Sequence, residues 1–264
     1  MIVAQIERQE LESILAGYQG NAVFSQKLEQ SVRDEDFLRV LANYVEFNSV
    51  FGGGVLNLAG EVAVRQDIFR DTNISVVLGD RSFVIAKGIF YAAIDELGDR
   101  NTPHKKTHRQ LAQETLAETA SFLGYDVRAL DLMVHPITYE AMQKVKDGYG
   151  LNQPMDATKL FKAMGFHLGS ERLADDEFCI LDNYLHLRRR DLVYHLSRID
   201  SYYWIKVHTT VEAEHFDAGL KAANSALFFY AEKEGRNRMK DAILTGFKEF
   251  AQVQEDFMKG LQGA

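Results

Sequence analysis

Two histidines and a glutamate in residues 208–215 have the spacing of metal ligands on one face of a helix. The segment reads His-Thr-Thr-Val-Glu-Ala-Glu-His. Each residue of an α-helix turns by about 100°, so His208, Glu212 and His215 fall within about 60° of one another. Glu214 points about 100° or more away from them. A solvated polar stripe or an internal His–Glu network has the same spacing, so the triplet alone does not settle the chemistry.

The residues around this triplet favour a buried helix face. Trp204 precedes the triplet on that face, and Gly219 and Ala222 follow it. Charged groups are costly to bury unless they are paired or bound to a metal. The triplet therefore needs partners from other parts of the chain.

The first candidate partners lie on either side of a Gly/Pro connector. Asp95 and Glu96 end an apolar helical segment, and His108 begins the next one. We expect Glu96 to face inward and Asp95 to be more solvated, because a stripe recurs every fourth residue through Val84, Gly88, Ala92 and Glu96. The connector can fold His108 back against Glu96.

A later acid, Glu171, is the next candidate. It follows Gly165 and Gly169, small residues that would allow a helix to approach its neighbours closely. Glu177 competes with it as a ligand. One earlier acid, Glu61, is held in reserve as a further ligand because it lies inside an apolar run.

Composition excludes several functions. The net charge of −8 gives no support to binding of nucleic acid or of an anionic membrane. The single cysteine, Cys179, excludes a disulfide within the chain and reads as a small core residue. No stretch has the apolar length of a membrane helix, and residues 1–12 lack the features of a secretory signal. We expect a cytoplasmic protein.

The pattern along the chain predicts an all-α fold in one domain, residues 1–264. Only 3 prolines occur, and short loops separate segments of helical periodicity. We expect helices over 82–97, 104–123, 157–178, 180–196 and 200–232, with a break near residue 179. The triple glycine at 52–54 lacks a phosphate-loop pattern and is expected to pack closely inside a helical hairpin. Residues 75–78 could form a strand.

The order of these motifs resembles the heme-oxygenase-like diiron oxidases and oxygenases, within the helical superfamily that also holds TenA and pyrroloquinoline-quinone synthase. The resemblance covers about residues 90–219 and rests on Asp95-Glu96, His108-x-x-Leu111, Glu171 and the 208–215 motif. It implies a single-domain heme-oxygenase-like helical bundle. It also implies six metal ligands: Glu96, His108, Glu171, His208, Glu212 and His215.

The resemblance further implies two iron(II) ions, dioxygen as cosubstrate and a small, amino-acid-derived substrate. The implied reactions are oxidative cleavage, desaturation or N-oxygenation, with an external electron donor and a homodimer both compatible with the family. The chain has Glu212 where many relatives have aspartate. N-oxygenating relatives use an additional carboxylate upstream of the Asp95-Glu96 pair. The resemblance makes Glu61, Asp67 and Asp71 the possible residues for it here, and none of them is compelling.

Two other functions stay open at this point. One is a metal-independent enzyme on the same scaffold, similar to thiaminase or pyrroloquinoline-quinone synthase, although Cys179 does not stand in a reactive context. The other is a helical binding protein with an incidental His/Glu network. The absence of histidine before His104 speaks against heme binding.

Overall fold

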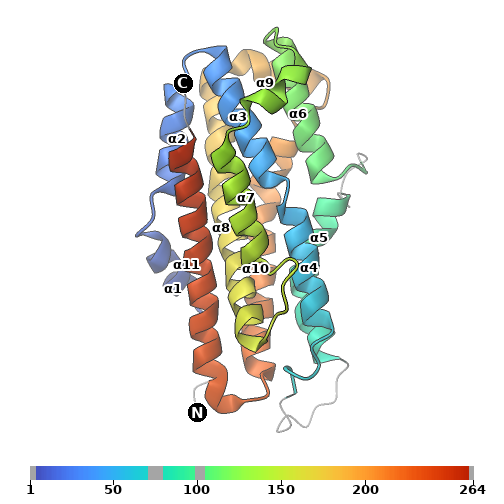
Figure 1. Ribbon diagram of the computed structural model, residues 1–264. Helices are drawn as coiled ribbons and strands as arrows, with labels where there is room; N and C mark the ends of the chain where they lie inside the picture. The colour runs from blue at the N-terminus through green and yellow to red at the C-terminus, as the bar shows by residue number, and fades with distance from the viewer. Residues whose placement is uncertain (1–3, 71–79, 99–104, 262–264) are drawn as a thin grey trace.

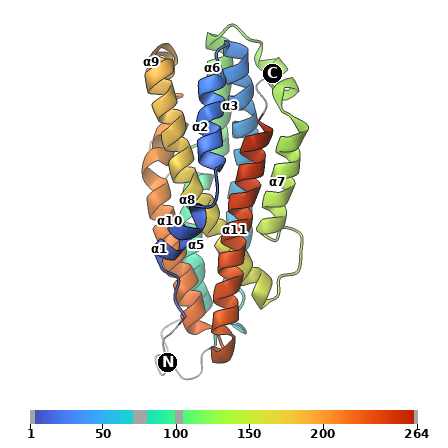
Figure 2. The same cartoon turned by 90° about the vertical axis from the view of Figure 1, so that its left-hand side faces the viewer.

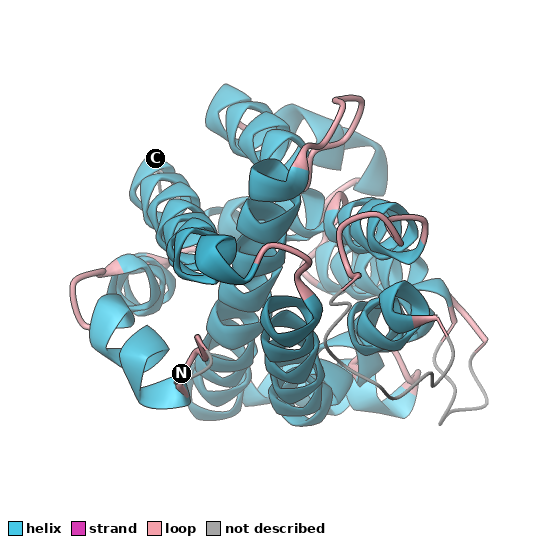
Figure 3. Ribbon diagram, turned by 90° about the horizontal axis from the view of Figure 1, so that it is seen from below, coloured by secondary structure: helices cyan, strands magenta, loops and turns pink. Residues whose placement is uncertain are grey.

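Helices make up most of the computed structural model, which describes residues 4–70, 80–98 and 105–261. No strand occurs in these ranges, which confirms the all-α class (Figure 3). The helices are α1 (Arg8–Leu15), α2 (Gly20–Gln30), α3 (Asp34–Asn48), α4 (Phe51–Ala63), α5 (Arg81–Leu97), α6 (His108–Phe122), α7 (Pro136–Gly148), α8 (Ala157–Arg188), α9 (Arg190–Arg198), α10 (Tyr203–Phe229) and α11 (Arg236–Gly260), with short 3₁₀ turns at Val127–Met133 and Lys233–Gly235.

Three long helices form the centre of the bundle (Figures 1 and 2). Helices α8, α10 and α11 have 32, 27 and 25 residues, and α8 packs against both of the others. Helices α3 to α6 cover the side of α10 and α8 that carries the candidate ligands. The buried apolar side chains form a continuous core, with Trp204, Tyr44 and Tyr149 among the largest fully buried ones.

Two glycines bring α8 and α11 into backbone contact. A Cβ on Gly165 would lie 1.8 Å from the carbonyl oxygen of Ile243, and one on Gly246 would lie 1.9 Å from that of Lys162. Gly169 faces Phe250 in the same way, at 2.9 Å from its Cβ. The expectation that Gly165 and Gly169 permit a close approach is therefore confirmed.

Helix α8 runs without the break expected near residue 179. It is continuous over Ala157–Arg188, and α9 begins only at Arg190. The segment 170–188 contains no glycine or proline that would interrupt a helix, and Phe178, Leu181 and Leu185 continue its buried face. The separation into two helices at residue 179 was wrong.

Local capping signals fix the start of the helices that carry the site. The Asp80 side chain accepts a hydrogen bond from the Ser82 amide at the start of α5, and that helix ends before Gly98 as expected. Thr107 and Gln110 form a capping box at the start of α6, which makes His108 the first residue of that helix.

The triple glycine lies inside α4 rather than in a loop. A Cβ on Gly54 would lie 2.5 Å from the ring of Tyr149, so this position admits no larger side chain without movement. A Cβ on Gly52 would lie 3.1 Å from a carboxylate oxygen of Glu96, one of the candidate ligands. The strand considered at 75–78 falls outside the described residues. No helix in the described ranges is both long and apolar enough to cross a membrane.

Candidate metal centre

The structure brings the six candidate ligands together in two groups of three. One group holds Glu96, His108 and His208, and the other holds Glu171, Glu212 and His215. Within each group, one ligand atom from every residue lies within 4.8 Å of the others. Four helices supply them: α5, α6, α8 and α10.

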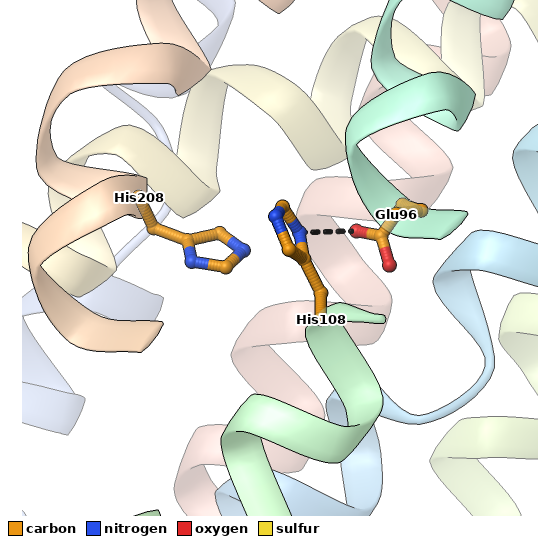
Figure 4. A group of neighbouring side chains, drawn as sticks. All are labelled: Glu96, His108 and His208. Carbon is orange, nitrogen blue, oxygen red and sulfur yellow. Dashed lines mark ion pairs between the residues drawn. The ribbon is translucent and has the colours of Figure 1, made fainter. Parts of the chain in front are cut away.

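In the first group, side chains from three helices point toward one another (Figure 4). The Nδ1 atom of His108 lies 3.4 Å from a carboxylate oxygen of Glu96, and the rings of His108 and His208 are 4.4 Å apart between centroids. Among the described residues, neither ring nitrogen of His108 has a hydrogen-bond partner, although the side chain is only 3% exposed. A metal ion would satisfy such a buried, unpaired nitrogen.

The contacts of His208 leave its Nε2 atom available for a metal. Its Nδ1 atom lies 2.6 Å from the carbonyl oxygen of Trp204, so Nδ1 carries the proton and donates it there. The ring also stacks on Phe178 at a centroid distance of 4.1 Å. Burial and the nearby His108 hold the pKa of His208 well below its usual value, which favours the neutral form that binds metals.

The second group is buried more completely. The Nδ1 atom of His215 lies 3.4 Å from Glu171 and 3.5 Å from Glu212, and all three side chains are less than a tenth exposed. On its other side, Nε2 of His215 lies 3.0 Å from a carboxylate oxygen of Asp95. A carboxylate on the far nitrogen of a metal-binding histidine commonly fixes its tautomer and ring orientation.

Glu212 faces both groups. One of its oxygens lies 3.6 Å from Nε2 of His208, and the other lies 3.5 Å from Nδ1 of His215. The spacing of four and three residues on α10 places the carboxylate between the two imidazoles. Its two oxygens can therefore serve two metal ions at once.

Opposed pKa shifts show that the second group is short of positive charge. Burial and then the charge of Glu171 raise the pKa of Glu212 well above its usual value. Burial would also raise the pKa of Glu171, but the charges and hydrogen bonds of His167 and His215 outweigh it and hold that pKa well below its usual value. The pKa of His215 is raised, because hydrogen bonds to Asp95, Glu171 and Glu212 outweigh the effect of burial. A divalent cation would relieve the repulsion between these carboxylates.

Asp95 is the buried member of the Asp95-Glu96 pair, contrary to the expectation from the sequence. Asp95 is 5% exposed, whereas the side chain of Glu96 is 24% exposed. The assumed stripe takes every fourth residue of the helix. Four residues exceed one helical turn by about 40°, so the stripe drifts around the helix axis at each step. Its first member, Val84, therefore lies on the surface. Glu96 still reaches His108, but Asp95 was missed as a partner of the site.

Replacing Asp95 with asparagine is expected to weaken metal binding without removing a ligand. The amide cannot balance the charge of a histidine or accept its proton as strongly, so we expect about 10–100-fold lower affinity for iron(II). Anaerobic iron(II) titration of Asp95→Asn checks this. An affinity equal to that of the wild type would show that Asp95 does not orient His215.

Three polar residues lie beside Glu171: His167, Ser170 and Tyr149. Nδ1 of His167 lies 3.2 Å from a Glu171 oxygen, and the Tyr149 hydroxyl lies 2.8 Å from Oγ of Ser170. His167 was not among the candidate residues predicted from the sequence, although its position four residues before Glu171 places both on one helix face.

The other candidate acids do not join either group. Glu61 lies on α4 outside both groups, and Asp67 pairs with Arg65 near the surface at 3.0 Å. Asp71 falls outside the described residues. Glu177 is buried, but Tyr44 and Gln254 hold it instead.

A small cavity adjoins both ligand groups. It has a volume of about 40 Å³ and is lined by Glu96 and His208 of the first group and by Glu171 and Glu212 of the second. A cavity needs about 10–15 Å³ to hold one water molecule, so this one can admit water or dioxygen. Apolar walls come from Phe47, Phe51, Phe178 and Phe250.

Solved structures of other proteins share this arrangement of helices. A CADD-like protein of unknown function from Nostoc punctiforme has a TM-score of 0.59 at 17% identity, covering 96% of this chain and 91% of that one. A TenA homolog from Pseudomonas syringae has a TM-score of 0.61 at 10% identity, with the same coverage. This chain has the TenA-like fold.

The TenA-like fold confirms the heme-oxygenase-like helical bundle expected from the motif order. At these identities the likeness concerns the fold and does not carry over an activity. No protein-family model matches the sequence, and no curated protein matches it either. The function must therefore be inferred from the two ligand groups.

Proposed function

We propose that the protein is a non-heme diiron oxidoreductase that uses dioxygen to oxidise a small, amino-acid-derived metabolite. The observation that carries this proposal is the position of Glu212, whose two oxygens face the two ligand groups. Three carboxylates and three imidazoles form a donor set suited to iron(II). Two iron(II) ions bound here would supply the electrons with which dioxygen is first reduced.

Each proposed ligand has a contact or an environment consistent with its role. His208 and His215 are held in the required tautomer by the Trp204 carbonyl and by Asp95. Glu212 would bridge, and Glu171 would bind the buried ion. Glu96 and His108, together with His208, would hold the other ion.

The cavity defines where the chemistry would occur. Phenylalanine side chains form part of its wall, and an apolar wall limits side reactions of reactive oxygen species. A second cavity of about 20 Å³ lies beside Glu96, His108 and His208 and reaches the partly exposed Arg109. A guanidinium there can pair with the carboxylate of an amino-acid-derived substrate.

Oxygen consumption tests the proposed function. Protein loaded with iron(II) under anaerobic conditions is exposed to dioxygen together with each of a panel of amino acids. We expect metal-dependent oxygen consumption that one class of amino acid accelerates, with an oxidised product detected by mass spectrometry. Equal turnover of a substrate by chelator-treated, metal-free protein would instead support a metal-independent enzyme.

No particular feature of the structure favours a metal-independent enzyme that uses a cysteine nucleophile. Cys179 is partly buried, and burial followed by the charges of Asp175, Asp176 and Asp182 raises the pKa of its thiol. These acids lie within four residues of Cys179 on α8, and they disfavour a thiolate. The partly exposed Cys179 is not the small core residue expected from its apolar neighbours.

The remaining partners stay predictions of the sequence. An external electron donor would be required if the substrate supplies fewer electrons than dioxygen consumes. A homodimer and a cytoplasmic location are retained as predictions, as is the absence of nucleic-acid and membrane partners.

A further inference from the structure

Glu177 is a buried carboxylate that belongs to neither ligand group. It lies on α8 and is 4% exposed. One of its oxygens accepts a hydrogen bond from the Tyr44 hydroxyl of α3 at 2.8 Å, and the other accepts one from the Gln254 amide of α11 at 2.9 Å. No arginine, lysine or histidine among the described residues forms an ion pair with it. A buried carboxyl without a cation has a strong tendency to hold a proton.

Glu177 lines the same cavity as the candidate ligands. The walls of this 40 Å³ cavity include Glu177 together with Glu171, Glu212 and His208. Its neighbour Phe178 stacks on His208, which fixes this turn of α8 against α10. Glu177 therefore borders the cavity in which dioxygen would be reduced.

The surroundings of Glu177 allow it both to hold and to release a proton at neutral pH. Burial raises its pKa to about 7, while the hydrogen bonds from Gln254 and Tyr44 oppose the rise and the charge of Asp176 adds to it. An acid with a pKa near the working pH is best suited to transfer protons. The other titratable groups that face the same cavity are Glu96, Glu171, His208 and Glu212.

We propose that Glu177 is the residue that delivers protons into the cavity during dioxygen reduction. This inference rests on the proposed function, which supplies the electrons from iron(II) and from the substrate. Each electron that takes dioxygen toward water must be matched by a proton. In the step, the O–H bond of the Glu177 carboxyl breaks and an O–H bond forms on the reduced oxygen. The remaining carboxylate keeps its two donors, Tyr44 and Gln254, until solvent water returns a proton.

A purely structural role for Glu177 makes a different prediction. Glu177 joins α3, α8 and α11 through its two hydrogen bonds. The simpler alternative to proton transfer is therefore that Glu177 only holds these helices together. Glutamine at position 177 has the same size but cannot release a proton. Gln254 can turn its amide toward the new side chain, because its Oε1 atom has no partner among the described residues. If Glu177 has only this structural role, Glu177→Gln would change the stability of the protein but not the pH profile of the reaction.

The first experiment measures the proton on Glu177 in metal-free protein. A carboxyl whose pKa is raised by folding contributes stability below its unfolded pKa, and this stability is lost as the pH rises through the folded pKa. The difference in urea midpoint between the wild type and Glu177→Gln should therefore fall between about pH 5 and pH 8. A difference that is constant over this range would show that Glu177 does not titrate there, and it would overturn the inference.

The second experiment measures oxygen consumption by iron-loaded protein. Glu177→Gln should bind as much iron as the wild type but consume oxygen about 10²–10⁴-fold more slowly. The wild-type rate should fall above about pH 7, where Glu177 loses its proton, and the variant should lack this dependence. Asp241→Asn, which removes an exposed acid of α11 outside the cavity, should keep the wild-type rate and pH profile.

The outcomes separate this inference from the proposed function. A Glu177→Gln variant with the wild-type rate and pH profile would overturn the inference and leave the diiron proposal intact. Loss of iron in this variant would mean that Glu177 supports the metal site, which would also overturn it. A wild type that takes up no iron and consumes no oxygen would overturn the proposed function, and the proton delivery with it.

Discussion

The variant His215→Ala is expected to lose both iron ions and all measurable oxygen consumption. His215 is the one imidazole of the buried group, with Nδ1 3.4 Å from Glu171 and 3.5 Å from Glu212. Without it, the two carboxylates must hold an ion alone, and Glu212 loses the partner that fixes one of its oxygens. Because Glu212 faces both groups, we expect the defect to spread to the first ion. Iron content and oxygen uptake, measured on the same sample, check this expectation.

Matched variants separate loss of metal from loss of structure. His186→Ala removes a histidine that is 54% exposed on α8, and it should retain iron and activity. His215→Ala also leaves Asp95 buried without its imidazole, which should destabilise the metal-free protein. The double variant Asp95→Asn/His215→Ala should recover part of that stability and still bind no iron. A His215→Ala protein that binds iron like the wild type would contradict the assignment of the ligand.

The variant Gly165→Ala is expected to have the largest effect on stability. A Cβ at this position would lie 1.8 Å from the backbone oxygen of Ile243, and a backbone atom cannot move aside as a flexible side chain can. The helices α8 and α11 would have to separate, at a cost of about 3 kcal/mol. For a chain of this size, such a loss lowers the melting temperature by about 6–10 °C.

Gly60→Ala is the matched control for this substitution. Gly60 is an exposed residue of α4, and a Cβ there would meet no atom within 4 Å. Alanine should stabilise the helix at this position by about 0.5–1 kcal/mol. Equal melting temperatures for Gly165→Ala and the wild type would show that the two helices tolerate a wider spacing.

The fold was largely predictable because its signals are local. Gly98 marked the observed end of α5, and the helical spacing of His208, Glu212 and His215 placed all three on a buried face. The continuity of α8 through residue 179 could have been read from the absence of glycine and proline in residues 170–188, but no such residue marks its end at Arg188.

The ligand groups were predictable from motif order, but most of their supporting contacts were not. Whether Asp95 or Glu96 faces inward depends on the rotation of the last turn of α5, and a count of every fourth residue drifts by about 40° per step. The contact between His167 and Glu171 joins residues four apart on α8 and was readable from the sequence. The contacts of Tyr149 with His167 and Ser170 join the residue after α7 to α8, and such contacts between distant segments have no signature in one sequence.

Anomalous X-ray scattering at the iron edge, from crystals loaded with iron(II) under anaerobic conditions, tests the central claim most directly. The account predicts two iron peaks in each chain. One should lie between Glu96, His108 and His208, the other between Glu171, Glu212 and His215, with Glu212 in contact with both. The absence of iron from these positions, or iron bound only elsewhere on the chain, would contradict it.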